Sequence, residues 1–140
     1  MTTTRPDVVD RLCHATNAHD LDALEACFAP DYRNVTPVHP ARGFVGSAQV
    51  RKNWDQLFAA MPDLRSHIVA RVTDADVVWS EWEMRGTRPD GGVHLMRGVI
   101  VFSTASDRIA SARFYLEPVD PGSEDIDATI GSIVTSDTTA

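Results

Sequence analysis

Ile109-Ala-Ser-Ala-Arg-Phe-Tyr-Leu-Glu117, near the end of the chain, has the pattern of a β-strand with two unlike faces. Side chains two residues apart lie on the same side of a strand, so Arg113, Tyr115 and Glu117 share one face. The opposite face is apolar and is typical of a packing surface. The polar face is therefore either half solvated or the lining of a pocket, and this choice decides whether an enzyme is expected.

The residues just before this strand alternate with the same period of two. They predict three further strands, at about 65–73, 76–88 and 93–103, joined by turns at Thr73-Asp-Ala-Asp and Pro89-Asp-Gly-Gly. Ser106-Asp107 makes one more turn into the strand quoted above. Four consecutive strands joined by short turns predict an antiparallel meander.

Helical spacing dominates the first half of the chain. One helix is predicted to start at Pro6, a second short one to be capped by Asp20 and to end before Pro30, and a third to be capped by Ser47 and to end at Met61. Tyr32 to Thr36 reads as a short strand. The predicted fold class is α+β, with three N-terminal helices packed on one face of a curved antiparallel β-sheet.

Length and charge favour a single domain over residues 1–118, followed by an acidic tail over residues 119–140. The tail is expected to dock in part, through Ile126, Ile130 and Ile133, and to be loose at its end. The net charge is −7, and residues 118–140 contain five acidic residues and no Lys or Arg. This distribution offers no basic surface for nucleic acid or anionic lipid.

The chain has no apolar run near the ~20 residues that span a bilayer, and its first residues do not resemble a signal peptide. A cytoplasmic location is therefore expected. Cys13 and Cys27 lie among apolar neighbours and are expected to be buried thiols, with a disulfide as the less favoured alternative.

Five local motifs, together with the order of the elements, resemble those of the SnoaL-like polyketide cyclase family, within the cone-shaped NTF2-like superfamily. The motifs are Phe28-Ala-Pro-Asp-Tyr32, Gly43-Phe-Val-Gly-Ser47, Met61-Pro-Asp-Leu64, Arg97-Gly-Val-Ile-Val-Phe102 and the closing Arg-Phe-Tyr-Leu-Glu. The resemblance covers roughly residues 8–118. It implies a cone whose helices close one side and whose meander lines an internal cavity, but it does not fix the reaction.

The resemblance also implies that the acid on the last strand points into this cavity, as an Asp does in the cyclases. Here the position holds Glu117, one methylene longer. In relatives that resemble limonene epoxide hydrolase, such an acid holds a water molecule with a Tyr and an Asn, and here Tyr32 and Asn34 match that pair. The Arg-x-Asp of those hydrolases is replaced by Trp82-Glu-Met84, which disfavours epoxide hydrolysis.

If Glu117 faces the cavity, strand alternation predicts that its neighbours on the adjacent strands face it too. Glu117, His94, Tyr32 and Asn34 are the predicted catalytic residues, because they combine proton-transfer groups with hydrogen-bonding groups. The predicted substrate-binding residues are Tyr115, Trp82, Met84, Met96, His39, Trp54 and Ile100. The alternatives are an ion pair of Glu117 with Arg113, a structural His94, a solvated His39 and core positions for the large apolar residues.

Besides water addition by Glu117, Tyr32 and Asn34, which would need His94 as its acid partner, two functional hypotheses follow from this pattern. The first is a cofactor-independent enzyme in which Glu117 moves a proton on a hydrophobic, carbonyl-bearing small molecule, leading to cyclisation, isomerisation or dehydration. The second is a domain of the same fold that binds a small molecule or dimerises without catalysis. No metal-binding spacing is present, so neither metal nor cofactor is expected. A homodimer is predicted through the outer sheet face, at Trp79, Glu81 and Glu83.

Overall fold

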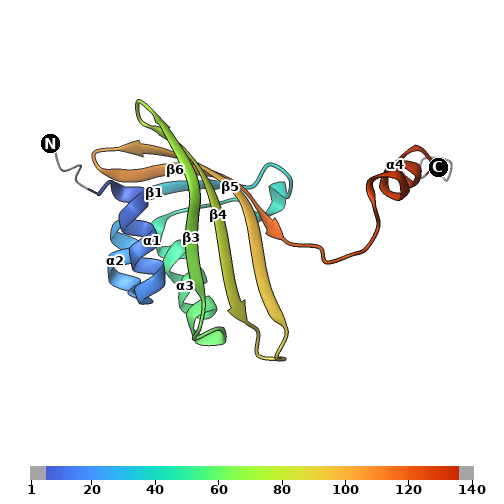
Figure 1. Ribbon diagram of the computed structural model, residues 1–140. Coiled ribbons are helices and arrows are strands. Elements are labelled where there is room, and N and C mark those ends of the chain that lie inside the picture. Colours follow the sequence, from blue (N-terminus) through green and yellow to red (C-terminus); the bar gives the residue numbers. More distant parts are fainter. Residues whose placement is uncertain (1–5, 136–140) are drawn as a thin grey trace, which may run out of the picture.

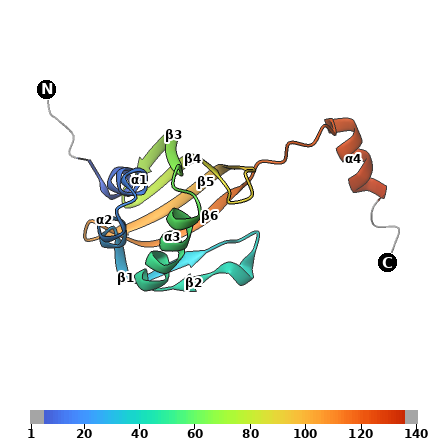
Figure 2. The ribbon, with the colours of Figure 1, turned by 90° about the horizontal axis from the view of Figure 1, so that it is seen from below.

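The computed structural model describes residues 6–135, which form one curved sheet with helices on one of its faces (Figure 1). In chain order the elements are α1 (Val8–Ala18), α2 (Leu21–Ala26), β1 (Phe28–Val35), the 3-10 turn η1 (Pro40–Arg42), β2 (Phe44–Val45), α3 (Ser47–Ala60), β3 (Arg65–Asp74), β4 (Val77–Thr87), β5 (Val93–Ala105), β6 (Arg108–Pro118) and α4 (Ile126–Thr135). Helices α1, α2 and α3 all lie on the same side of the sheet (Figure 2). The predicted α+β class is confirmed.

The six strands follow the order β2-β1-β6-β5-β4-β3. Strands β3 to β6 form the predicted antiparallel meander. Strand β1 pairs in parallel with β6, so the prediction of a wholly antiparallel sheet is wrong at this one pairing. Since α3 and the four strands β2 to β5 separate β1 from β6 in the sequence, the chain can return in the parallel direction.

Two boundaries in the first half differ from the predictions. Phe28 begins β1, and Pro30 lies inside this strand, where the pairing with β6 is irregular between Phe28 and Arg33. A proline is tolerated at such an irregularity because no ladder hydrogen bond requires its missing N–H. Helix α3 has Gly46 as its N-cap and Ser47 as its first residue, so the predicted serine cap is wrong.

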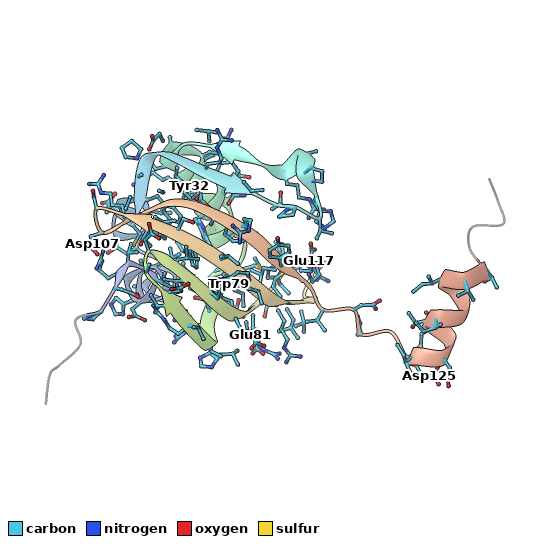
Figure 3. All side chains as sticks on the ribbon, turned by 90° about the horizontal axis from the view of Figure 1, so that it is seen from above. Tyr32, Trp79, Glu81, Asp107, Glu117 and Asp125 are labelled. Carbon is cyan, nitrogen blue, oxygen red and sulfur yellow. The ribbon has the colours of Figure 1, made fainter. Side chains whose placement is uncertain are left out.

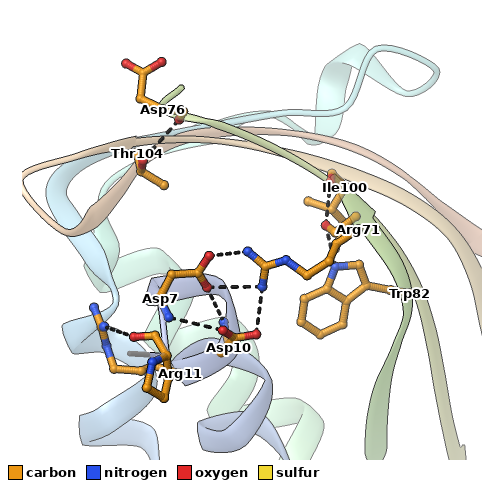
Figure 4. Close-up of polar contacts among 10 residues, drawn as sticks. Asp7, Asp10, Arg11, Arg71, Asp76, Trp82, Ile100 and Thr104 are labelled. Carbon is orange, nitrogen blue, oxygen red and sulfur yellow. Dashed lines mark hydrogen bonds and ion pairs between the residues drawn. The ribbon is translucent and has the colours of Figure 1, made fainter. Parts of the chain in front are cut away.

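Trp82 and Ile100 belong to the packed core, each with 1% of its surface exposed. The Trp82 Nε1 donates to Ser80 Oγ at 2.8 Å, and Ser80 Oγ donates to the Ile100 carbonyl at 2.7 Å (Figure 4). These hydrogen bonds satisfy the polar atoms that the core buries. Both side chains face the helices, as their strand alternation predicted, but they fill the interior and do not line a cavity.

Polar contacts from α1 protect the free edge of β3. Asn17 imitates a neighbouring strand, because its Oδ1 accepts from the Ser66 N–H at 2.7 Å and its Nδ2 donates to the Ser66 carbonyl at 2.9 Å. Further along the edge, Arg71 forms ion pairs with Asp7 and Asp10 at the start of α1 (Figure 4). An edge covered in this way offers few unpaired backbone groups to another chain.

Helix α4 follows a linker that leaves the end of β6, and it lies away from the rest of the domain (Figures 1 and 2). Ile126, Ile130, Ile133 and Val134 are between 49% and 71% exposed, and the docking predicted through the isoleucines is not observed. The loose end predicted for the tail lies outside the described residues. Cys13 and Cys27 are free thiols, of which Cys27 is buried. Among the helices of residues 6–135, none combines the length and apolar character that crossing a membrane requires.

Candidate functional site

A cavity of about 280 Å³ lies between α3, the strands β1 and β2, and the inner face of the meander. Its apolar wall is formed by Phe28, Phe44, Val50, Trp54, Leu57, Met84, Met96, Phe114 and Leu116. Its polar lining residues are all uncharged amides, hydroxyls or imidazole: Tyr32, Asn34, Thr36, Asn53 and His94. Such a wall, apolar with a few polar groups, is typical of a site for a small, neutral molecule.

Tyr32 and Asn34 form a buried pair on β1. They face the same side of the strand because they are two residues apart, and they are 1% and 8% exposed. The Tyr32 hydroxyl donates to Asn34 Oδ1 at 2.7 Å. Burial raises the pKa of the Tyr32 phenol far above its ordinary value, so this hydroxyl remains a donor across the physiological pH range. The hydrogen bond from Tyr32 therefore fixes the Asn34 amide and occupies its oxygen.

His94, near the start of β5, brings a titratable group to the cavity. Its pKa is lowered, first by burial and then by the positive charge of Arg88. Both effects disfavour the charged imidazolium, so the ring is predominantly neutral at neutral pH and can accept a proton. Met84 and Met96 face each other on the adjacent strands β4 and β5 and lie on the same wall.

The direction predicted for Tyr115 and Glu117 is wrong. Strand β6 pairs with β5 so that Leu116 lies opposite Gly98, in the row that faces the helices, and Glu117 lies opposite Arg97 in the outward row. The apolar side chains Phe114 and Leu116 therefore form the cavity wall. Figure 3 looks onto the outer face, where Glu117 lies with Trp79 and Glu81. The sequence shows that the two faces of β6 differ, but it does not show which of them matches the inner face of β5.

Glu117 contacts His39 instead of the cavity. The His39 Nε2 lies 2.7 Å from Glu117 Oε1, and each side chain is more than one third exposed. This contact joins the loop around η1 to the end of β6, and His39 is not among the residues that line the cavity. The arrangement of Glu117, Tyr32 and Asn34 that water addition would require is therefore not formed.

Asn53 and Thr36 are polar cavity residues that the sequence analysis missed. Asn53 lies on α3 within the stripe formed by Val50, Trp54 and Leu57, and all four line the cavity. A polar residue inside an apolar helical stripe is the signal that could have identified it. Thr36 follows β1 directly, and its position carries no such signal.

A larger hollow of about 570 Å³ lies between α1 and α2. Two of its charged residues are already engaged: Arg11 with the Pro6 carbonyl and with Asp107, and Asp10 with Arg71. The smaller cavity is the better candidate because its polar groups converge from β1, α3 and β5. Within residues 6–135, no group of three His, Cys, Asp or Glu side chains is placed to hold a metal ion.

Solved structures similar to this chain share its fold. IdmH from Streptomyces antibioticus, a proposed polyketide cyclase, is 20% identical with a TM-score of 0.68, and the match covers 79% of this chain and 89% of IdmH. A proposed SnoaL-like polyketide cyclase from Jannaschia sp. CCS1 is 19% identical with a TM-score of 0.67, covering 84% and 92%. A hypothetical protein with a ketosteroid isomerase-like fold from Catenulispora acidiphila, in complex with trimethylamine, is 21% identical with a TM-score of 0.65, covering 80% and 87%.

These similarities establish an NTF2-like fold, with α+β content and a curved open sheet. None of the curated proteins compared with the chain matches it. The family model described as "SnoaL-like domain" matches residues 9–112, which is most of the chain. The chain therefore belongs to the SnoaL-like domain family.

Proposed function

We propose that this protein is a cofactor-independent acid/base enzyme that acts on a small, neutral, hydrophobic carbonyl compound. The observation that carries the proposal is the presence of His94 and Asn34 on one apolar cavity of about 280 Å³. His94 supplies a neutral base, and Asn34 supplies a hydrogen-bond donor. The family and the proposed polyketide cyclases among its structural neighbours support this class of function.

In the proposed reaction, an imidazole nitrogen of His94 accepts a proton from the carbon next to the substrate carbonyl. The electrons of the broken C–H bond form the carbon–carbon double bond of an enolate, and the negative charge moves to the oxygen. Asn34 Nδ2 donates a hydrogen bond to this oxygen, while Tyr32 holds the amide in place. The protonated His94 then returns the proton to the same or another atom, which permits isomerisation, cyclisation or dehydration.

The proposal can be tested without the natural substrate. 2-Tetralone is a two-ring ketone with acidic protons next to its carbonyl, and we expect the protein to accelerate their exchange with D₂O, followed by proton NMR. Tetralin, the hydrocarbon of matching shape, should inhibit this exchange because it competes for the apolar wall. A rate equal to that of buffer at saturating 2-tetralone would contradict the proposal.

We also propose a homodimer formed through the outer face of the sheet. One row of cross-strand neighbours crosses five strands on this face: Val72, Trp79, Val101, Arg113 and Val35. Trp79 is 50% exposed and Val72 68% exposed, and the Arg113 guanidinium carbon lies 5.8 Å from the centre of the Trp79 ring. Glu81, Glu83, Arg97 and Arg113 give the face charges of both signs, which suits a two-fold contact with a second copy.

Trp79→Glu should convert this dimer to a monomer, because it replaces the large exposed aromatic side chain of this row by a charge. Analytical ultracentrifugation at several concentrations measures the mass. Val38→Glu is the matched control, since Val38 is 62% exposed and lies outside the row. A wild-type chain that sediments as a monomer at all concentrations would refute the dimer.

A further inference from the structure

Asn53 lines the cavity, and the oxygen of its amide is already occupied. On α3, the Gln49 Nε2 donates to Asn53 Oδ1 at 2.8 Å. These residues are four apart, so their side chains lie one above the other on the same side of the helix. An amide has one oxygen acceptor and one NH₂ donor group. With its oxygen bonded to Gln49, Asn53 has its NH₂ group left for a ligand.

Asn34 is held in the same way on β1. Its Oδ1 accepts from the Tyr32 hydroxyl, and its Nδ2 has no hydrogen bond to any of the residues 6–135. Buried side-chain nitrogens and oxygens in this part of the chain all have partners, so the Asn34 NH₂ group reaches accessible space. Asn34 and Asn53 both line the 280 Å³ cavity. Two separate elements, β1 and α3, therefore each contribute to the lining of one cavity an amide whose oxygen is bonded and whose NH₂ group is not.

We propose that Asn34 and Asn53 form a two-donor site for a single acceptor oxygen, such as the oxygen of a ketone or of the enolate formed from it. Gln49 and Tyr32 are positioning residues, since they act by fixing which end of each amide faces the ligand. Neutral donors suit an uncharged carbonyl in the ground state and stabilise negative charge when it develops on the oxygen. This inference takes one point from the proposed function, namely that the ligand is a carbonyl compound.

Asn53→Leu tests the donor directly, because leucine has a similar volume and no polar atom. Dissociation constants of 2-tetralone and tetralin are measured by ligand-observed NMR for wild type and variant, and their ratio cancels the different solubilities of the two probes. We expect Asn53→Leu to weaken 2-tetralone binding about tenfold and to leave tetralin binding within twofold. The retained tetralin binding shows that the variant is folded.

Gln49→Glu tests the positioning. A carboxylate only accepts hydrogen bonds, so Asn53 must turn its NH₂ group toward residue 49 and its oxygen toward the cavity. We expect this variant to lose 2-tetralone affinity about as strongly as Asn53→Leu, although Asn53 itself is retained. Gln56→Glu, at an exposed position on the same helix, adds the same charge and should leave both dissociation constants unchanged.

An unchanged probe ratio in Asn53→Leu, or no measurable binding of 2-tetralone to the wild type, would overturn the two-donor site. A changed ratio in Asn53→Leu with an unchanged ratio in Gln49→Glu would overturn the role of Gln49. These measurements need no turnover, so they separate the two proposals. If Asn53→Leu changes the ratio of the two dissociation constants but the wild type does not accelerate proton exchange, the two-donor site is supported and the proposed enzyme is refuted. If the wild type accelerates exchange but Asn53→Leu leaves the ratio unchanged, the enzyme is supported and the two-donor site is refuted.

Discussion

Replacing His94 by Gln should reduce the rate of 2-tetralone proton exchange by about 10² to 10⁴-fold, the usual contribution of a positioned acid or base. Glutamine retains hydrogen-bonding atoms of similar reach but cannot accept the proton. The binding of 2-tetralone should change little, so the loss is expected in the rate at saturation. Proton NMR in D₂O measures both quantities in one titration.

The wild-type rate should also depend on pH through His94. Because burial and Arg88 lower the pKa of this imidazole, the active neutral form predominates at pH 7. The rate is therefore expected to be level near neutral pH and to fall only below the ordinary imidazole pKa of about 6.5. The fall should be absent in His94→Gln. His67→Gln is the matched control, since His67 lies exposed on β3 and should leave the profile unchanged.

Gly98→Ala should destabilise the fold by about 3 kcal/mol or more. Gly98 has a φ of 154°, a conformation that side chains rarely adopt. A Cβ at this position would lie 2.1 Å from the Tyr115 carbonyl oxygen and 2.8 Å from the Leu116 Cα, both of them backbone atoms of β6. Relief of the clash requires β5 and β6 to separate beside the cavity. Urea unfolding, followed by circular dichroism, measures the loss.

Gly91→Ala is the control that separates two causes of the lost stability in Gly98→Ala: the clash of the new Cβ with β6 and the positive φ. Gly91 also has a positive φ, of 84°, but an added Cβ would meet nothing within 4 Å. This variant should lower the free energy of unfolding by about 1 kcal/mol, because only the backbone conformation disfavours the alanine. Equal losses in the two variants would show that the close approach of β5 and β6 at Gly98 is not what requires a glycine.

The periodicity of the sequence was sufficient to predict the meander and the helices that cover it. Short polar turn sequences, with or without glycine and proline, also located the turns of the meander, because turn preferences are local. The parallel pairing of β1 with β6 could not be predicted in this way, since it joins segments that are far apart in the chain. Local patterns do not specify which distant strands become neighbours.

The candidate site was predictable only in part, for a related reason. Tyr32, Asn34, Met84, His94, Met96 and Trp54 were predicted as site residues and line one cavity, although their roles stay predictions. Glu117 was assigned to the same cavity because the family resemblance implies an inward acid on the last strand, and the opposite face was interpreted as packing surface. A cavity for an apolar ligand is itself lined by packing-type residues, so Phe114 and Leu116 occupy the inner face. Only the register between β5 and β6 decides between the faces.

The central claim is that proton transfer takes place on the helix-facing side of the sheet and does not involve Glu117. The most direct measurement is the 2-tetralone exchange rate of Glu117→Gln beside that of His94→Gln, at pH 7 and saturating ketone. We predict that Glu117→Gln exchanges within about twofold of wild type, because its carboxylate contacts His39 outside the cavity, while His94→Gln loses at least about a hundredfold. A hundredfold loss in Glu117→Gln with little change in His94→Gln would contradict the account.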